Sequence, residues 1–268
     1  MTFEELFECE RLIAAHRGYR AVRPENTLSA FEASIGQCDF VELDVGFSSD
    51  GTAVLIHDDT LSRTTDAEAV EGFAPPYAVV DYPRETLQKL DASSWFLRSD
   101  PFGMVAESAH LREELMRLPV QHIPTLSEAL VLLGRHDVPI NIEIKDMRGT
   151  RFDETAVATI AALVQSFCME EKVLLSSFNH QYLREAKRIA PQIMRAALQE
   201  GAHPKALIAY LKDLDVACYH CDLEITTPEI VRAVIDAGMI ANVYTVNTPE
   251  EKERVFAWGV KSVFTDFL

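Results

Sequence analysis

Apolar residues in this chain follow two periods that alternate along its length. Short, mostly apolar runs, typical of buried strands, alternate with stretches in which apolar side chains recur every three or four positions, as on one face of a helix. The runs predict strands at residues 12–15, 40–45, 140–144, 173–176, 193–198, 216–219, 240–246 and 262–264. Helices are predicted at residues 28–36, 124–136, 153–167, 179–190, 204–211, 228–237 and 249–258. Eight strands in alternation with helices are typical of an α/β fold of the TIM (β/α)8 barrel type.

The second predicted strand continues into a β-hairpin over residues 40–58. The Asp-Gly pair at 50–51 is a strong signal for a two-residue turn, and such a turn places Asp44 opposite His57. Opposite side chains point to one side of a sheet, as do side chains two apart on a strand, so Glu42 joins that face. Two carboxylates and an imidazole suit a hard divalent cation such as Mg²⁺ or Ca²⁺, with the histidine left for proton transfer. An ordinary exposed strand face that carries acidic residues is the alternative interpretation.

The periodicity breaks down between residues 59 and 121. This segment has prolines throughout and one weakly helical piece at 107–117. An irregular segment of this length inside a compact domain usually has a function or is disordered. We interpret the chain as a single barrel domain over residues 1–268, with a small insertion at 59–121 near the mouth of the active site.

Composition and charge narrow the class of partner. With 48% hydrophobic residues in 268, the chain can build a sizeable core. A formal charge of −17 repels nucleic acid and anionic membranes, which favours small-molecule ligands. The acidic start has no basic, apolar leader, and no later run has the length of a membrane span, so we expect a cytoplasmic protein without a membrane anchor. The five cysteines predict no disulfide framework, and we interpret the Cys-x-x-Cys motif at 218–221 as structural.

Polar residues cluster where the predicted strands end. In a (β/α)8 barrel the active site lies at the carboxyl ends of the strands. The clusters at those ends are His16 and Arg17, Glu42 and Asp44, Glu143 and Lys145, Ser176 and Ser177, and Asp266. Because the isoleucines at 142 and 144 alternate with Glu143 and Lys145, we expect the isoleucines to face the helices and the charged pair to face the barrel axis.

Several short motifs together resemble one known family. They are HRG at 16–18, PENT at 24–27, ELD at 42–44, DG at 50–51, HDDTLSRTT at 57–65, IEIK at 142–145, SSF at 176–178 and YTVN at 244–247. In this order and spacing they resemble the glycerophosphodiester phosphodiesterases, closest to the small cytosolic bacterial enzymes. The departures are Tyr244, where tryptophan is common, and Leu268, where a proline often stands.

The resemblance implies metal-dependent hydrolysis of glycerophosphodiesters to glycerol 3-phosphate and an alcohol. It implies that His16 and His57 are the acid and the base, in an order the sequence leaves open. One divalent ion, Mg²⁺ or Ca²⁺, would be held by Glu42, Asp44 and Glu143. Arg17 and Lys145 would bind the phosphate, and Phe178 and Tyr244 are candidate substrate contacts for which plain packing is the alternative. The expected partner is a small-molecule glycerophosphodiester, and a homo-oligomer stays open.

Two competing functions are consistent with the same motifs. A lysophospholipase D-type enzyme would need an apolar approach for an acyl chain. The insertion has suitable aromatic residues, namely Phe73, Tyr77, Tyr82, Trp95, Phe96 and Phe102. A catalytically silent phosphate-binding barrel is the other alternative, against which the two histidines and three carboxylates count. His220, placed just past the sixth predicted strand, could also contact substrate at the rim.

Overall fold

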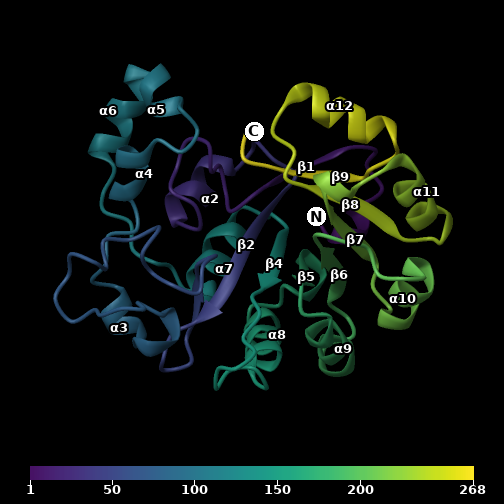
Figure 1. The fold of residues 1–268 in the computed structure, drawn as a ribbon, viewed down its shortest axis with the longest axis horizontal. Helices are drawn as coiled ribbons and strands as arrows, with labels where there is room; N and C mark the ends of the chain where they lie inside the picture. The colour runs from purple at the N-terminus through teal and green to yellow at the C-terminus, as the bar shows by residue number, and fades with distance from the viewer.

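The computed structural model describes residues 1–268 and contains a closed barrel of parallel strands surrounded by helices (Figure 1). The barrel strands are β1 (Leu12–Ala15), β2 (Phe40–Phe47), β4 (Ile140–Ile144), β5 (Val173–Ser177), β6 (Met194–Gln199), β7 (Cys218–Asp222), β8 (Ile240–Tyr244) and β9 (Ser262–Thr265). The barrel closes because β1 pairs in parallel with both β2 and β9. The predicted TIM barrel is confirmed.

Helices follow the strands in the expected alternation. Those around the barrel are α2 (Leu28–Ser34), α7 (Leu126–Arg135), α8 (Ala156–Ser166), α9 (His180–Ile189), α10 (Leu207–Leu214), α11 (Pro228–Asp236) and α12 (Pro249–Ala257). Two 3-10 turns, η2 (Glu170–Lys172) and η3 (Leu223–Ile225), complete the connections. Thr227 and Thr248 cap α11 and α12, each accepting a hydrogen bond from the backbone N–H three residues on, and a proline follows each cap. No helix is both long enough and apolar enough to cross a membrane.

The main core lies between the barrel and its helices. Ile142 and Ile144 on β4 are fully buried in it with residues of α7 and α8, as the alternation with Glu143 predicts. The short helix α1 (Phe3–Leu6) closes the opposite end of the barrel. Phe3 packs edge-on against Phe40 of β2, with ring centroids 5.3 Å apart. The end of the barrel at the amino termini of the strands is therefore closed by apolar side chains. Any polar site must lie at the carboxyl ends of the strands.

The hairpin forms, but its predicted register is wrong by one residue. β3 (Ala53–Leu55) returns antiparallel to β2 and pairs Val45 with Leu55. The loop has three residues instead of two, because Gly51 is left-handed (φ +82°) but Asp50 is not, whereas a two-residue type I′ turn needs both. Gly51 donates its N–H to Ser48 O at 3.0 Å, as in a type I turn followed by a left-handed residue. A slip of one residue moves side chains to the other face of a strand. Ile56, and not His57, therefore bonds to Asp44 through the backbone.

Residues 59–121 form several short helices beside the barrel, on the left of Figure 1. These are η1 (Val79–Asp81), α3 (Arg84–Leu87), α4 (Ser94–Ser99), α5 (Met104–Glu107) and α6 (Ala109–Arg117). One apolar cluster, around Leu61 and Leu90, joins them to Val54 and Ile56 of the hairpin, and a second, around Trp95 and Phe96, lies within the segment. We refer to residues 59–121 as the excursion.

Candidate active site

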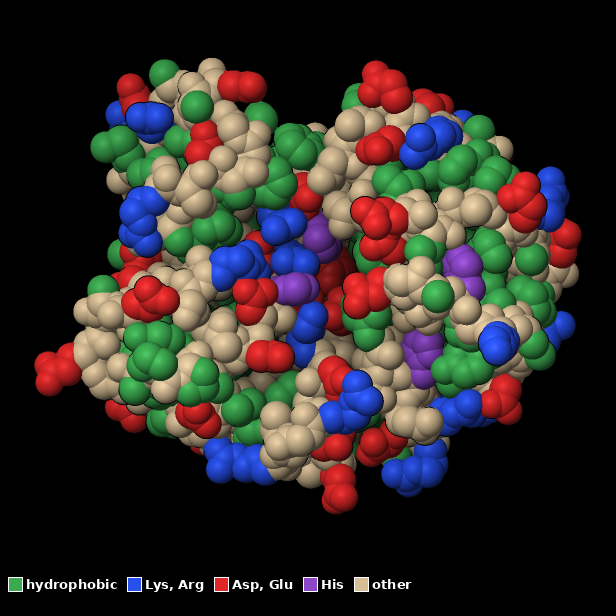
Figure 2. Space-filling view, in the orientation of Figure 1, with side chains coloured by type: hydrophobic (Ala, Val, Ile, Leu, Met, Phe, Trp, Pro, Cys, Tyr) green, Lys and Arg blue, Asp and Glu red, His purple; other side chains and the backbone are tan.

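A cavity of about 250 Å³ opens at the carboxyl ends of the barrel strands. Figure 2 shows this hollow near the centre of the molecule, with histidine and basic side chains on one side and acidic side chains on the other. Seven of the predicted site residues line it, namely His16, Arg17, Glu42, His57, Glu143, Phe178 and Tyr244. Asp44 and Lys145 lie behind them, outside the lining. None of the excursion's aromatic residues named above lines the cavity.

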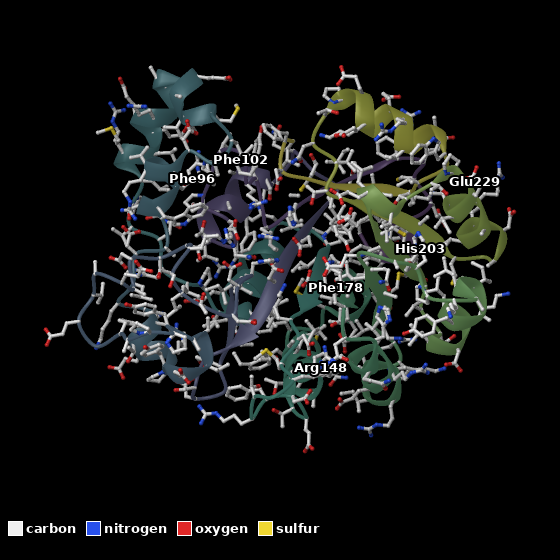
Figure 3. The ribbon with its side chains drawn as sticks, viewed as in Figure 1. Phe96, Phe102, Arg148, Phe178, His203 and Glu229 are labelled. Atoms are coloured by element: carbon white, nitrogen blue, oxygen red, sulfur yellow. The ribbon has the colours of Figure 1, made fainter.

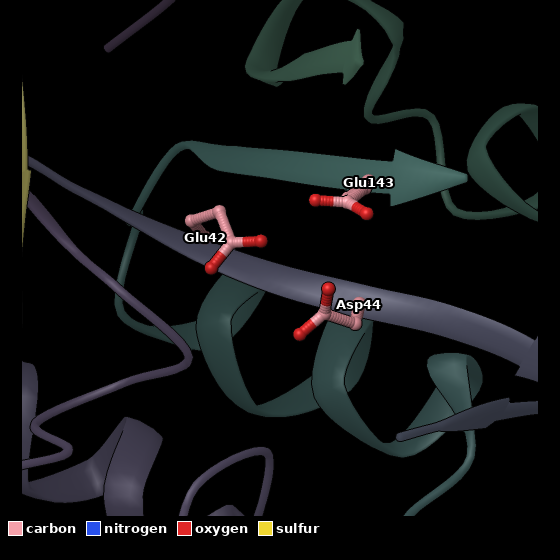
Figure 4. Close-up of side chains that lie close together, drawn as sticks. All are labelled: Glu42, Asp44 and Glu143. Carbon is pink, nitrogen blue, oxygen red and sulfur yellow. The ribbon is translucent and has the colours of Figure 1, made fainter. Parts of the chain in front are cut away.

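Three carboxylates meet between β2 and β4. Glu42 and Asp44 come from β2 and Glu143 from β4, where Asp44 and Glu143 are register partners (Figure 4). One oxygen of each lies within 4.8 Å of the others, and all three side chains are buried. Burial and the neighbouring carboxylates raise the pKa of both Glu42 and Glu143. Burial acts to raise the pKa of Asp44 too, but Arg17 and Lys145 lower it to about 2.

This cluster fits a hard divalent cation. Asp44 Oδ1 is buried and accepts no hydrogen bond, although Lys145 Nζ lies 3.6 Å from it. A buried carboxylate oxygen without a hydrogen bond is costly, and oxygen ligands in such a group are what Mg²⁺ and Ca²⁺ prefer. Glu42, Asp44 and Glu143 are therefore the residues that could hold a metal ion.

The loop after β1 explains the His-Arg-Gly motif. Gly18 has φ +82°, and a Cβ there would lie 2.7 Å from the carbonyl carbon of Ala30, so only glycine fits. Arg17 also has a left-handed backbone (φ 56°) and donates its N–H to Glu42 Oε2 at 2.8 Å. Its guanidinium donates to Glu25 at 2.9 Å, and its Nε lies 3.3 Å from Asp44. A strained loop thus places Arg17 against the carboxylate cluster.

The Pro-Glu-Asn-Thr motif supports the same cluster from behind. Asn26, in a left-handed conformation that asparagine tolerates, donates to Asp44 Oδ2 at 2.8 Å and accepts the Asp44 N–H at 3.2 Å. Thr27 caps α2 by accepting the N–H of Ala30. Glu25 is buried and binds Arg17. Each residue after the proline therefore has its own structural task.

Both predicted histidines present Nδ1 to a carboxylate. His16 Nδ1 lies 2.8 Å from Asp266 Oδ1, and His57 Nδ1 lies 2.7 Å from Asp58 Oδ1. Burial opposes ionisation of both aspartates, but hydrogen bonds from the histidines and nearby arginines keep the pKa of each below its usual range. An ionised carboxylate only accepts, so Nδ1 of each ring is the donor and Nε2 is left for other partners.

Burial is the main cause that lowers the pKa of His16. The charge of Arg17 lowers it further, while the hydrogen bond to Asp266 opposes the shift. His16 is only 13% exposed on the barrel, whereas His57, on the hairpin side, is 34% exposed. His16 is therefore neutral near pH 7 and able to accept a proton.

Lys145 pairs with the carboxylate cluster, and its contact with phosphate stays a prediction. Its Nζ donates to Glu143 at 2.7 Å and lies 3.6 Å from Asp44 Oδ1. These carboxylates raise the pKa of Lys145 against the opposing effect of burial. The lysine here neutralises charge within the carboxylate cluster.

The wall of the cavity formed by β5 to β8 has aromatic and acidic side chains but no histidine–carboxylate pair. Phe178 is 38% exposed and meets the ring of Tyr244 edge-on at 6.1 Å, while the Tyr244 hydroxyl donates to the Gln199 carbonyl at 2.8 Å (Phe178 is labelled in Figure 3). Glu200 and Asp222 also line this wall, and neither forms an ion pair with a basic side chain. This wall is aromatic and acidic.

The suggested substrate contact of His220 is wrong. The residue lies inside β7, is fully buried, and packs beside Phe264 with ring centroids 4.9 Å apart. Burial lowers its pKa to about 3. Cys218 and Cys221 on the same strand are also buried, and burial raises the pKa of both thiols. The misplacement arose because the strand begins and ends later than the apolar run indicates.

Several charged residues near the histidines have no role predicted from the sequence. These are Arg20, Glu25, Asp58 and Arg63. Three of the four lie inside the motifs PENT and HDDTLSRTT, so the motifs themselves could have marked them as functional candidates. Two of their contacts are local, because Arg20 binds Glu25 and Arg63 binds Asp58 five residues away. The Glu25–Arg63 and Arg20–Asp266 contacts span 38 and 246 positions and leave no local pattern.

Comparisons with known proteins agree on one family. The sequence model of the "Glycerophosphoryl diester phosphodiesterase family" matches residues 16–268. A glycerophosphodiester phosphodiesterase of Caldanaerobacter subterraneus subsp. tengcongensis is 31% identical over 258 residues, which cover 95% of this chain and 93% of the relative. One from Bacillus altitudinis is 32% identical, with 95% and 94% covered.

Solved structures of similar chains have the same fold. A phosphodiesterase from Oleispira antarctica, determined in complex with the product sn-glycerol-3-phosphate, has a TM-score of 0.81 and 29% identity. The match covers 98% of this chain and 95% of that one. A protein from Silicibacter pomeroyi, described as a glycerophosphoryl diester phosphodiesterase, has a TM-score of 0.82 and 25% identity, with 96% and 90% covered.

Proposed function

Because this chain belongs to the glycerophosphoryl diester phosphodiesterase family, we propose that it hydrolyses glycerophosphodiesters to glycerol 3-phosphate and an alcohol with the help of His16, His57 and a divalent metal ion. It is an enzyme of the phosphodiesterase class. The observation that carries the finer proposal is that two histidine–carboxylate pairs and a buried group of three carboxylates border one cavity.

Phosphodiester hydrolysis needs both charge neutralisation and proton transfer. Glu42, Asp44 and Glu143 would hold the metal ion. When bound, such an ion polarises a phosphoryl oxygen and orients a glycerol hydroxyl. Arg17, whose guanidinium already lies in the cavity wall, would bind another phosphate oxygen through a charge-assisted hydrogen bond.

The histidines would act through Nε2. One imidazole removes the proton of the attacking hydroxyl, and the other, protonated, donates a proton to the departing alcohol oxygen. His16, neutral near pH 7, suits the base, and His57, more exposed and next to Asp58, suits the acid. The attacking group is either water, which gives glycerol 3-phosphate directly, or a neighbouring glycerol hydroxyl, which gives a cyclic phosphate that water then opens. Both agree with this assignment.

The lysophospholipase D-type alternative has less support. Trp95 and Phe96 are buried, and Phe73 packs on Tyr82 with ring centroids 4.6 Å apart. These rings pack against one another and line no channel from the cavity. An acyl chain would therefore have to lie on the surface.

Release of glycerol 3-phosphate from glycerophosphocholine and glycerophosphoethanolamine tests the proposal. The purified protein is assayed with Mg²⁺, with Ca²⁺ and with EDTA, and lysophosphatidylcholine is tested in parallel. We expect metal-dependent release from the water-soluble diesters. Release that persists in EDTA would remove the metal from the proposal, and activity confined to the lysolipid would replace the substrate class.

A further inference from the structure

A continuous series of hydrogen bonds and ion pairs joins the two histidines behind the cavity wall. We call it the ion-pair chain. Its members, in order, are His16, Asp266, Arg20, Glu25, Arg63, Asp58 and His57. The five residues between the histidines alternate in charge, and the order of side-chain types is the same from either end. Glu25 is its midpoint.

Two arms lead from Glu25, one to each histidine. In the arm toward His16, a single oxygen of Asp266 contacts both His16 and Arg20. Asp266 Oδ1, which lies 2.8 Å from His16 Nδ1, also accepts Arg20 Nη1 at 3.1 Å. Arg20 Nε donates to Glu25 Oε2 at 2.9 Å. Asn247 donates to the other oxygen of Asp266 at 2.8 Å, so both oxygens of that carboxylate are fixed.

The arm toward His57 is built from paired hydrogen bonds. Arg63 donates to both oxygens of Asp58, from Nε at 2.6 Å and from Nη2 at 2.8 Å. It also donates to both oxygens of Glu25, from Nη1 at 3.0 Å and from Nη2 at 2.7 Å. Paired bonds of this kind fix the planes of guanidinium and carboxylate relative to each other.

Glu25 holds both arms without touching a histidine. Its side chain is 2% exposed and accepts from Arg17, Arg20 and Arg63. Burial acts to raise its pKa, but the hydrogen bonds and charges of these arginines keep it well below the usual range. The residue is therefore an ionised, fully bonded anchor, and it does not line the cavity.

Aromatic side chains of the excursion cover the two arginines. The guanidinium carbon of Arg20 lies 5.2 Å from the ring centroid of Phe102, and that of Arg63 lies 6.0 Å from the ring centroid of Trp95. Phe102 is labelled in Figure 3, between the excursion and the barrel. Such stacking restrains the guanidinium planes that the carboxylates need.

We propose that Glu25 is a positioning residue that sets the orientation and the tautomer of both His16 and His57. This inference rests on the proposed function, in which these histidines transfer the two protons. An imidazole keeps its proton on Nδ1 only while a correctly oriented carboxylate accepts it. Asp266 and Asp58 have that orientation because Arg20 and Arg63 hold them, and Glu25 holds both arginines. The alternative is that the ion-pair chain only anchors the excursion to the barrel.

The main test replaces Glu25 by glutamine, which keeps the shape and removes the charge. For E25Q we expect kcat to fall about 30-fold, as for the loss of other supporting partners, with a smaller rise in KM because Arg17, a proposed phosphate ligand, also loses its charged partner. Two-bond ¹H–¹⁵N correlation spectra of ¹⁵N-histidine-labelled protein, recorded at a pH where both rings are neutral, give the tautomers. We expect Nδ1–H in the native protein for both histidines, and mixed tautomers for both in E25Q.

Variants of one arm separate the two histidines. Arg20→Lys should change the tautomer of His16 alone, and Arg63→Lys that of His57 alone, each with a fall in kcat of about fivefold to tenfold. Arg84→Lys is the matched control for Arg63→Lys. Arg84 also lies in the excursion, pairs with Glu128 at 3.3 Å, and has a side chain 37% exposed against 39% for Arg63. It should leave kcat and both tautomers unchanged.

Several results would overturn the inference. A folded E25Q with native tautomers, whether or not its melting temperature falls, would leave only the anchoring role. If E25Q does not fold, the one-arm variants decide, and unchanged tautomers in both, or equal changes in Arg84→Lys, would refute it. A native protein that releases no glycerol 3-phosphate would refute the proposed function instead, since the tautomers are measured without substrate.

Discussion

The two walls of the active-site cavity differ in whether their charged side chains have ion-pair or hydrogen-bond partners. On the wall formed by β1, β2, β4, β9 and the hairpin, His16 and Arg17 have carboxylate partners. On the wall formed by β5 to β8, Glu200 and Asp222 have no basic partner, and Phe178 is partly exposed. Groups that are paired before substrate arrives are preorganised, which is what a chemical step requires. Groups without partners stay free to contact a substrate by charge or by packing.

The largest effect should come from the paired wall. We expect His16→Ala and His57→Ala each to lower kcat by about 10²–10⁴-fold, the usual contribution of a general acid or base. Release of glycerol 3-phosphate and thermal unfolding are measured together, and folding should be retained. His110→Ala, at an exposed position on α6, is the control. Substantial activity in either active-site variant would refute the assignment.

Removing charge from the carboxylate cluster should separate activity from stability. Because the pKa of Glu42 is raised on folding, the metal-free protein should lose stability as pH rises above the ordinary glutamate range. Glu42→Gln should abolish activity yet be more stable than the metal-free parent at pH 8, because the neutral amide avoids the buried negative charge that raises the pKa of Glu42. Urea unfolding at pH 5 and pH 8, with and without Mg²⁺, measures this. Equal stability of parent and variant at both pH values would argue against a strained carboxylate cluster.

The lowered pKa of His16 predicts where activity and stability begin to fall at acid pH. The unfolded chain takes up a proton near pH 6.5, whereas the folded protein takes it up at lower pH, so this group costs stability as pH falls below about 6.5. If His16 is the base, log kcat/KM should begin to fall only below that pH. The pH–rate profile and the titration of His16 by NMR should then coincide. A limb that starts well above pH 6.5 would assign it to another group.

The smallest effect should come from the unpaired wall. If Glu200 and Asp222 face the alcohol moiety, they favour a cationic alcohol over a neutral one. We expect the double variant Glu200→Gln, Asp222→Asn to lower kcat/KM for glycerophosphocholine about fivefold relative to glycerophosphoglycerol, because exposed charges contribute about 0.5–1 kcal/mol each. Glu229→Gln on α11, an exposed position labelled in Figure 3, is the control. An unchanged ratio would show that this wall does not select the alcohol.

Local sequence patterns predicted the barrel well. Each barrel strand was placed within about two residues at its start, because buried strands are short apolar runs and the helices between them have caps and a clear period. The residue types needed for the chemistry were also visible, since HRG, ELD and IEIK end predicted strands. Most of the excursion's helices were missed, because helices as short as Arg84–Leu87 have no measurable period.

The sequence by itself therefore determined the order of strands and helices and the side chains that reach the rim of the barrel. Only the tertiary structure decided the register of the hairpin, because Gly51 is left-handed while Asp50 is not, which makes a three-residue loop. It alone decided the distant partners of the charged groups. His16 meets Asp266 across 250 positions of sequence, and Glu25 meets Arg63 across 38. Such pairs form because β9 closes on β1 and the excursion folds back over the rim, and neither event leaves a local pattern in the chain.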